Sequence, residues 1–195
     1  MDNRKKFGFH KKQIALIAMV VSCIALLAAG TLAYFTAEET NYNVITTPGL
    51  NIRLEEETDG GEPWPEEGFS DIKPGMDVTK IAYVTNTGDV DAYIRIALKK
   101  TITPAEGVDA ELNFDQITLD INTTDWTEQD GIYYYNKMLA SGESTTPLFT
   151  NVHFGEGLGN EYKKARVVIT VTAQAVQVKN NGDSALTAAG WPAVD

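Results

Sequence analysis

The chain has 195 residues and a formal net charge of −11, from 16 Lys or Arg and 27 Asp or Glu. This excess of negative charge repels phosphate backbones and anionic lipid surfaces, so it argues against nucleic-acid or headgroup binding. The length suits one domain of ordinary size plus a targeting segment, and it argues against a second large core.

The first 29 residues have the pattern of a secretory signal peptide. Residues 1–12 carry five Lys or Arg against one Asp, and residues 14–29 hold no charge and are rich in Ile, Leu, Val and Ala. As a helix, that apolar run would measure about 24 Å, which is shorter than the roughly 30 Å hydrocarbon core of a bilayer. The pattern therefore favours a signal helix that is removed after export.

The cut is expected where small residues stand at positions −1 and −3. Thr31 and Ala33 satisfy this rule, as does the segment that ends at Gly30, and we expect cleavage between Ala33 and Tyr34. The alternative is a retained anchor, in which the apolar run continues through Phe35. Both alternatives keep the Lys/Arg cluster inside the cell and send the rest of the chain outside.

Removal of residues 1–33 leaves 11 basic and 26 acidic residues, a net charge of −15. Cys23, the only cysteine, is lost with the signal, so the mature chain has neither a disulfide nor a thiol nucleophile. His153 is then the only histidine, which excludes HExxH and other multi-histidine zinc sites, and no GxSxG elbow accompanies it. We predict no catalytic residue, no metal site and no cofactor, and hence no enzyme.

Period-two alternation of apolar and polar residues recurs along the mature chain and predicts half-buried β-strands. The longest run, residues 164–178, places Val167, Ile169 and Val171 on one face. Turn-forming residues separate the runs, and no strong helix interrupts them. Seven or eight such strands predict an all-β, antiparallel sandwich of jelly-roll type, which we prefer to a closed barrel. The other expected strands cover residues 50–54, 78–84, 94–98, 117–121, 131–139 and 146–154.

Three segments call for separate interpretation. Residues 55–68 are acidic and rich in Gly and Pro, which predicts a solvated loop. Residues 182–191 predict a short helix, with Trp191 folded back as a hydrophobic clasp. The tyrosines at 133–135 alternate across a strand, so at least one ring points outward, where it would suit contact with a glycan or a protein, although a core role is favoured.

A calcium loop of the EF-hand type is excluded around Gly131. Aligned on that glycine, the loop would have Trp126 at position 1 and Lys137 at position 12, where acidic ligands are required. Asp89 and Asp91 flank a turn, and their spacing suits either a shared cation or a hydrogen-bonded hairpin turn.

Four stretches of the sequence form an ordered series of patterns. They are GTLAYFTAEET at residues 30–40, IKPGMDVTKIAYVTNTGDVDAYIRIAL at 72–98, WTEQDGIYYYNKMLASGESTTPLF at 126–149 and ITVTAQAVQ at 169–177. Together with Trp191, this series resembles the TasA and camelysin (CalY) family of exported fibre proteins of Gram-positive bacteria. Residues 55–68 and 105–111 fall outside the resemblance.

The resemblance implies that a dedicated signal peptidase, SipW, cuts after Ala33, and that the domain is a jelly roll secreted to the cell surface or biofilm matrix. It also implies assembly by donor-strand exchange, in which the N-terminal arm, residues 34–46, adds a strand to the next subunit. The alternative is that this arm forms the first strand of its own sandwich, residues 47–195. The expected side-chain anchors of the arm are Tyr34, Phe35, Tyr42, Val44 and Ile45.

The sequence thus predicts a secreted structural protein, a subunit or accessory of an extracellular fibre of a Gram-positive bacterium. Its expected partners are copies of itself or related fibre subunits, and a SipW-like peptidase during export, with membrane contact only through the signal segment. The alternative is a monomeric surface module that binds a glycan, a host protein or calcium. Some camelysin relatives are described as metal-dependent proteases, but a single histidine and no cysteine give the mature chain no zinc site.

Overall fold

The computed structural model describes residues 36–40, 43–44, 49–65 and 73–194, so the expected signal helix, residues 1–33, lies outside the described residues. Within the described part, every regular element except one short 3₁₀ turn is a β-strand. The elements are β1 Thr36–Thr40, β2 Asn43–Val44, β3 Ile52–Glu57, β4 Met76–Asn86, β5 Ala92–Thr103, β6 Ile117–Leu119, β7 Trp126–Gln129, β8 Ile132–Tyr135, β9 Phe149–Phe154, the 3₁₀ turn Asn160–Tyr162 and β10 Arg166–Gln177.

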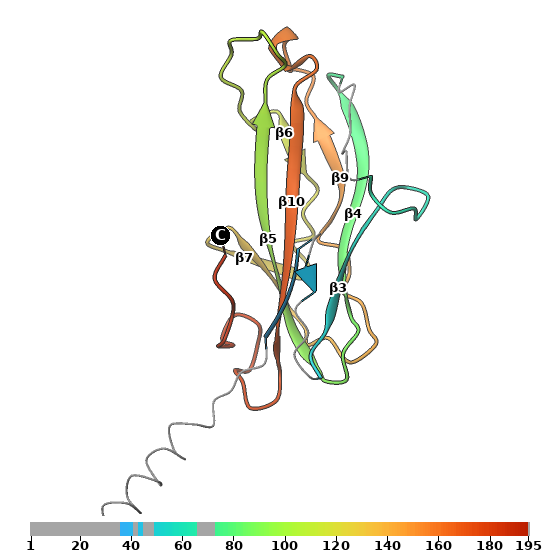
Figure 1. Ribbon diagram of the computed structural model, residues 1–195, viewed down its shortest axis with the longest axis vertical. Coiled ribbons are helices and arrows are strands. Elements are labelled where there is room, and N and C mark those ends of the chain that lie inside the picture. Colours follow the sequence, from blue (N-terminus) through green and yellow to red (C-terminus); the bar gives the residue numbers. More distant parts are fainter. Residues whose placement is uncertain (1–35, 41–42, 45–48, 66–72, 195) are drawn as a thin grey trace, which may run out of the picture. The chain divides into compact units, whose positions relative to one another are not determined.

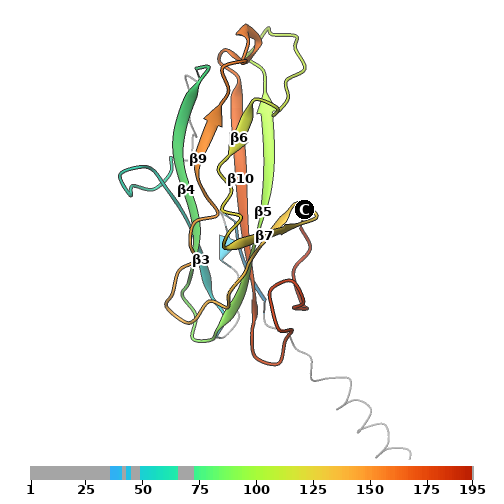
Figure 2. The same cartoon turned by 180° about the vertical axis from the view of Figure 1, so that it is seen from behind.

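The strands form two antiparallel sheets, which Figures 1 and 2 show from opposite sides. The six-stranded sheet has the order β2-β1-β10-β5-β8-β7, and the four-stranded sheet has the order β3-β4-β9-β6. In the six-stranded sheet, β1, the first strand of the described chain, therefore lies beside β10, the last. The all-β, two-sheet architecture confirms the class of fold that the alternation predicts.

The two sheets turn one face each toward a shared hydrophobic core. Ala82, Val84 and Phe149 enter it from the four-stranded sheet, and Ile96 and Ala173 enter it from the six-stranded sheet. Burial of such apolar side chains contributes about 25 cal/mol per Å² removed from water, which is the main favourable term in folding. The alternation of each strand is therefore what fixes which face it turns inward.

The pairing of β5 with β10 is the longest ladder of the fold. All twelve residues of each strand are in register, from Arg166 opposite Thr103 to Gln177 opposite Ala92. Both strands are rich in β-branched residues, which suit a pleated surface packed on one side. Figure 1 shows the two strands side by side along the sheet.

Residues 55–57 belong to strand β3, so the prediction of a loop from residue 55 onward is wrong at its beginning. Each of the three glutamates has its own partner across or along the sheet: Glu55 pairs with Arg53, Glu56 with Lys80, and Glu57 accepts a hydrogen bond of 2.7 Å from the Tyr83 hydroxyl. That last bond raises the pKa of Tyr83 to about 12. Acidic side chains with such partners are compatible with an edge strand.

The turn between β7 and β8 explains the acidic residues near Gly131. Asp130 and Gly131 both have positive φ, 55° and 79°, as the two central residues of a type I′ hairpin turn require. The Glu128 side chain accepts a hydrogen bond of 2.7 Å from the Gly131 N–H. These residues therefore build a hairpin, in agreement with the failure of the calcium-loop alignment.

Residues 182–191 form turns, so the prediction of a short helix there is wrong. The N–H groups of Thr187 and Ala188 both bond to the carbonyl of Ser184, and the bonds do not propagate into a helix. The side chain of Asn181 competes with helical pairing, since it accepts hydrogen bonds from the N–H groups of Gly182 and Ala189. The prediction that Trp191 folds back is confirmed, because it packs against the six-stranded sheet.

Candidate functional site

The expected N-terminal arm lies at an edge of the six-stranded sheet. Strand β1 pairs antiparallel with β10, from Thr36 opposite Val176 to Glu39 opposite Ala173, and β2 folds back to pair with β1. Of the predicted arm anchors, Val44 lies in β2. The other predicted site residues, Thr31, Ala33, Tyr34, Phe35, Tyr42 and Ile45, lie outside the described residues.

The part of β10 that receives β1 is the most deeply buried stretch of that strand. Residues 173–176, which we call the acceptor stretch, are at most 1% exposed. In contrast, residues 166–172 pair only with β5 among the described strands, so their second edge carries backbone groups outside any described ladder. A strand edge that lies outside a ladder is a template for pairing with another chain.

A row of side chains crosses the outer face of the six-stranded sheet at the acceptor stretch. The pairing registers place Gln174 opposite Arg95, and Arg95 opposite Tyr134. Arg95 is only 7% exposed, and its Nε donates a hydrogen bond of 2.7 Å to Oε1 of Gln174. A second guanidinium nitrogen donates to the Tyr134 hydroxyl at 3.3 Å, and a third donates to the carbonyl of Pro192.

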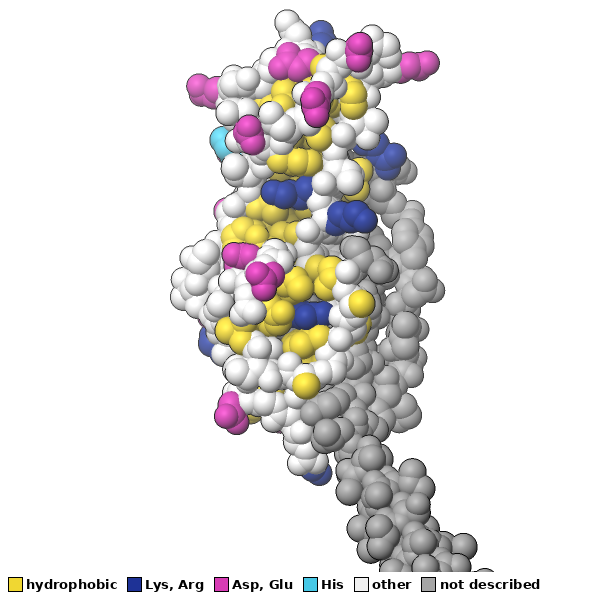
Figure 3. Space-filling view, turned by 90° about the vertical axis from the view of Figure 1, so that its left-hand side faces the viewer, with side chains coloured by type: hydrophobic (Ala, Val, Ile, Leu, Met, Phe, Trp, Pro, Cys, Tyr) yellow, Lys and Arg dark blue, Asp and Glu magenta, His cyan; other side chains and the backbone are white. Residues whose placement is uncertain are grey.

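Residues 182–193, which we call the C-terminal clasp, cover this row. Trp191 lies against the Arg95 guanidinium, 4.7 Å from its carbon to the ring centroid, and meets the Tyr134 ring edge-on at 6.0 Å. Tyr134, which lies on the outer face of its strand, is thus covered by Trp191. Figure 3 looks onto the side of the molecule that lies at the left of Figure 1, and it shows hydrophobic side chains gathered around isolated Lys and Arg side chains.

The outer face of the four-stranded sheet carries a second candidate site, a surface hollow of about 370 Å³ that we call the polar hollow. Asp77, His153 and Thr118 face one another in a row across three strands, β4, β9 and β6. The Nδ1 of His153 and the Oδ1 of Asp77 are 2.7 Å apart. The complete lining is Asp77, Thr118, Leu119, Asp120, Asn151 and His153.

Asp120 is fixed within the polar hollow by four hydrogen bonds. The N–H groups of Thr150 and Asn151 donate to its Oδ1 at 2.8 and 2.7 Å, and their side chains donate to its Oδ2. Partial burial raises the pKa of Asp120, but these hydrogen bonds outweigh burial and hold it below the ordinary value. The carboxylate is therefore ionised and oriented before any ligand arrives.

The polar hollow does not have the geometry of a catalytic triad or a metal centre. Among the described hydrogen bonds, the second ring nitrogen of His153 has no hydroxyl partner, although Thr118 is the cross-strand neighbour. No group of three or more His, Cys, Asp or Glu in the described part of the chain is arranged to hold a metal ion. The hollow can instead exchange hydrogen bonds with a polar ligand.

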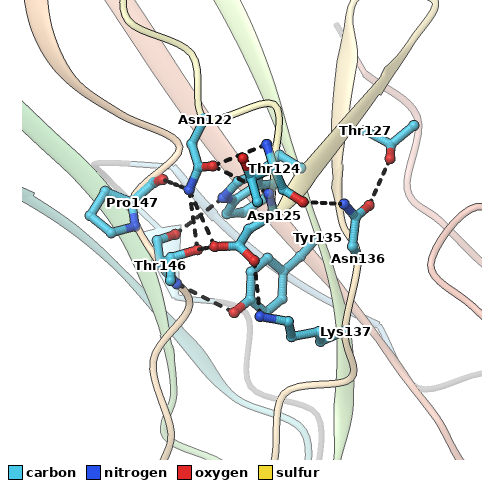
Figure 4. Close-up of polar contacts among 10 residues, drawn as sticks. Asn122, Thr124, Asp125, Thr127, Tyr135, Asn136, Lys137, Thr146 and Pro147 are labelled. Atoms are coloured by element: carbon cyan, nitrogen blue, oxygen red, sulfur yellow. Dashed lines mark hydrogen bonds and ion pairs between the residues drawn. The ribbon is translucent and has the colours of Figure 1, made fainter.

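A polar network around Asp125 joins two connections, the one between β6 and β7 and the one between β8 and β9 (Figure 4). The Asp125 carboxylate accepts hydrogen bonds of 2.9 Å from both the Lys137 ammonium and the Thr146 hydroxyl, and one of 3.4 Å from the Asn122 amide. The hydrogen bond from Lys137, and after it the one from Thr146, lowers the pKa of Asp125. The hydrogen bond to Asp125 in turn raises the pKa of Lys137. The network has a structural role, since its polar groups bond to one another.

Lys80 is a buried cation that faces the core from β4. Its side chain is 5% exposed, it forms an ion pair with Glu56 of β3, and its ammonium lies 4.5 Å from the centroid of the Trp64 ring. Burial lowers the pKa of Lys80, and the attraction of Glu56 opposes that shift. Lys80 thus joins β3, through Glu56, to the connection that follows β3, through Trp64. This contact explains how Trp64 packs in an otherwise polar segment.

Comparison with known proteins adds no family to these observations. The chain has no significant match among protein-family models, curated proteins or solved structures. In the part of the chain that the structure describes, there is no helix long and apolar enough to cross a membrane. The candidate functions below therefore follow from the geometry of the acceptor stretch and of the polar hollow.

Proposed function

We propose that this protein is a secreted, non-enzymatic structural subunit or accessory of an extracellular fibre, with a sandwich of jelly-roll type, and that it assembles by strand exchange at the β10 edge. The observation that carries the proposal is the position of β1. A five-residue strand next to the expected cleavage point lies between the two-residue edge strand β2 and the fully buried acceptor stretch. A strand of a second copy would find the same backbone partners there.

Two features of β1 favour exchange over permanent closure. Its sequence, TAEET, contains no large apolar residue, and it covers only four of the twelve residues of β10. A longer arm from another subunit would also reach the second edge of residues 166–172, and it would gain main-chain hydrogen bonds that β1 does not make. In this proposal Tyr34, Phe35, Tyr42, Val44 and Ile45 supply the side-chain anchors.

The other described sheet edges are poorly suited to pairing with a second chain. Strand β6 has three residues and β7 has four, of which the last three are exposed and polar. Strand β3 ends in three consecutive glutamates. Short and charged edge strands limit edge-to-edge association. The β10 edge is therefore the one at which we place assembly.

The proposed function also requires that the protein is secreted. A signal segment cut after Ala33 by a SipW-like peptidase would free the arm, and the protein would act in the biofilm matrix or on the surface of a Gram-positive bacterium. Its partners would be copies of itself or related fibre subunits. Neighbouring genes for such a peptidase and for similar secreted proteins would support this arrangement.

Electron microscopy of the purified mature protein, with and without residues 34–46, tests the proposal. The complete form should give filaments, and the shortened form should give none unless the missing arm is added as a peptide. A variant with Glu128→Gln in the β7 edge serves as the matched control and should polymerise normally. A complete form that stays monomeric under all conditions would contradict assembly.

The polar hollow favours a second candidate function, a monomeric surface module that binds a glycan. Oriented carboxylate, amide and imidazole groups such as those of Asp120, Asn151 and His153 suit the hydroxyl groups of a sugar. Screening of the mature protein and of His153→Ala on a glycan array would test this function. Binding that depends on His153 supports it, whereas binding to no glycan, or equal binding by both forms, excludes the hollow.

A further inference from the structure

The C-terminal clasp lies on the same residues of β10 that receive β1. The side chain of Gln174 donates a hydrogen bond of 3.3 Å to the carbonyl of Ala193, and Val176 packs in a cluster with Ala185 and Trp191. The hydroxyl of Tyr93, opposite Val176 in the β5 ladder, donates to the carbonyl of Gly182 at 2.9 Å. The clasp thus holds the outer face of the acceptor stretch, and β1 holds its edge.

Arg95 is the centre of the clasp. Its guanidinium lies within reach of the rings of both Trp191 and Tyr134, with carbon-to-centroid distances of 4.7 and 5.9 Å. Its three hydrogen bonds all go to neutral groups, one of them the carbonyl of Pro192 within the clasp. A buried cation held in this way stabilises the clasp through cation–π and hydrogen-bond interactions, and it leaves a costly uncompensated charge if the clasp departs.

We infer that the C-terminal clasp is a positioning element that stabilises any strand seated on residues 173–176 of β10, whether that strand is the chain's own β1 or the arm of a second copy. The reason is geometric: Gln174 and Val176 contact both β1 and the clasp. Their backbones pair with β1, and their side chains lie under the clasp. Loss of the clasp exposes this outer face and lets the acceptor stretch fray. The part concerning a second copy rests on the proposed assembly, and the part concerning β1 does not.

Hydrogen exchange of the full mature chain tests the inference with Arg95→Met, which keeps an apolar stem and removes the charge. We expect the amide protection of residues 36–40 and 173–177 to fall by about tenfold or more, while that of β4 and β9 is unchanged. Arg166→Met is the matched control, because Arg166 lies exposed on the same strand, opposite Thr103 and away from the clasp. Unchanged protection, or an equal loss in both sheets, would overturn the inference.

Two further variants keep the test decisive if Arg95→Met fails to fold. Trp191→Ala should reproduce the local loss of protection, and Trp191→Phe, which keeps a ring over Arg95, should restore most of it. Where filaments form, those of the Trp191→Ala variant should dissociate at a lower denaturant concentration than those of the parent protein. If the parent protein never polymerises, the proposed function fails, and the exchange data on β1 still decide the role of the clasp.

Discussion

Asn86 illustrates how one side chain fixes a connection between the two sheets. Its amide is fully buried, donates to the carbonyls of Val90 and Leu139 at 2.8 and 3.1 Å, and accepts from the N–H of Gly88 at 3.0 Å. A Cβ at Gly88 would lie 2.6 Å from the backbone nitrogen of Asn51, so this position requires glycine. The NTG pattern of residues 86–88 is thus explained by packing and hydrogen bonding within the turn.

Replacement of Asn86 by Ala should destabilise the protein by about 2–4 kcal/mol, because the three hydrogen bonds of a fully buried amide are lost. Chemical denaturation followed by tryptophan fluorescence measures the change. Thr87→Ala, an exposed substitution in the same turn, should alter the free energy of unfolding by less than about 0.5 kcal/mol. Equal effects of the two substitutions would show that the amide does not hold the turn.

The Asp125–Lys137 pair makes stability depend on pH at both ends of the scale. The folded-state pKa of Asp125 is lowered, so its contribution is present above the unfolded value of about 3.9 and disappears as the pH falls through the lower folded value. The pKa of Lys137 is raised, so its contribution is present below about 10.4 and disappears as the pH rises through the higher folded value.

Asp125→Asn should therefore flatten the dependence of the melting temperature on pH in the acidic range. Melting curves between about pH 2 and pH 6 for this variant and the parent protein provide the comparison. Glu143→Gln, which removes an exposed carboxylate of the connection between β8 and β9, should leave the acidic slope unchanged. An unaltered slope for Asp125→Asn would show that the network does not hold this carboxylate in its ionised form.

At the scale of the element, β1 and β10 differ in how many residues of each are paired with neighbouring strands. Strand β10 pairs along its full length with β5 and supplies Val171, Ala173 and Ala175 to the core. Strand β1 pairs with only four residues of β10 and with the two residues of β2. Fewer partners mean a lower free energy of local opening, so β1 leaves the sheet more readily than β10.

A disulfide that joins β1 to β10 should prevent assembly. Ala37 and Ala175 are Cα partners in the ladder, a spacing that suits a cross-strand disulfide in the double Cys substitution. Because Cys23 precedes the expected cut, the introduced pair would be the only thiols of the mature chain. The oxidised protein should stay monomeric in sedimentation experiments, and reductant should restore polymerisation; filaments of fully oxidised protein would contradict strand exchange at this edge.

At the scale of the whole molecule, the net charge of −15 expected for the mature chain opposes association. Screening by salt weakens repulsion between separated charges, since the Debye length falls from roughly 30 Å at 0.01 M to about 8 Å at 0.15 M. The rate of filament formation, measured by light scattering, should therefore increase over this range. A rate that falls with salt would show that attraction between opposite charges governs the encounter instead.

The strands were predictable because alternation with period two is a local property. In β4 the alternation groups Lys80 with Val78 and Val84, and the structure buries all three. Glu56, the partner of Lys80, was not predictable, since an acidic, Gly- and Pro-rich segment has no signal for a strand. Arg95, Gln174 and Asp120 were missed for a related reason. Their roles depend on contacts between segments far apart in the sequence, and alternation specifies a face but not a neighbour.

The adjacency of β1 and β10 also orders the events of folding. The chain is synthesised from its N-terminus, and β1 cannot complete its ladder until the last strand of the domain has been made. Apart from the pairing of β1 with β2, every other described ladder closes among residues 52–177, so the two sheets can form before β1 is in place. Strand β1 is thus among the last to be paired, and under the proposed function this interval is when a neighbouring molecule could take its place on β10.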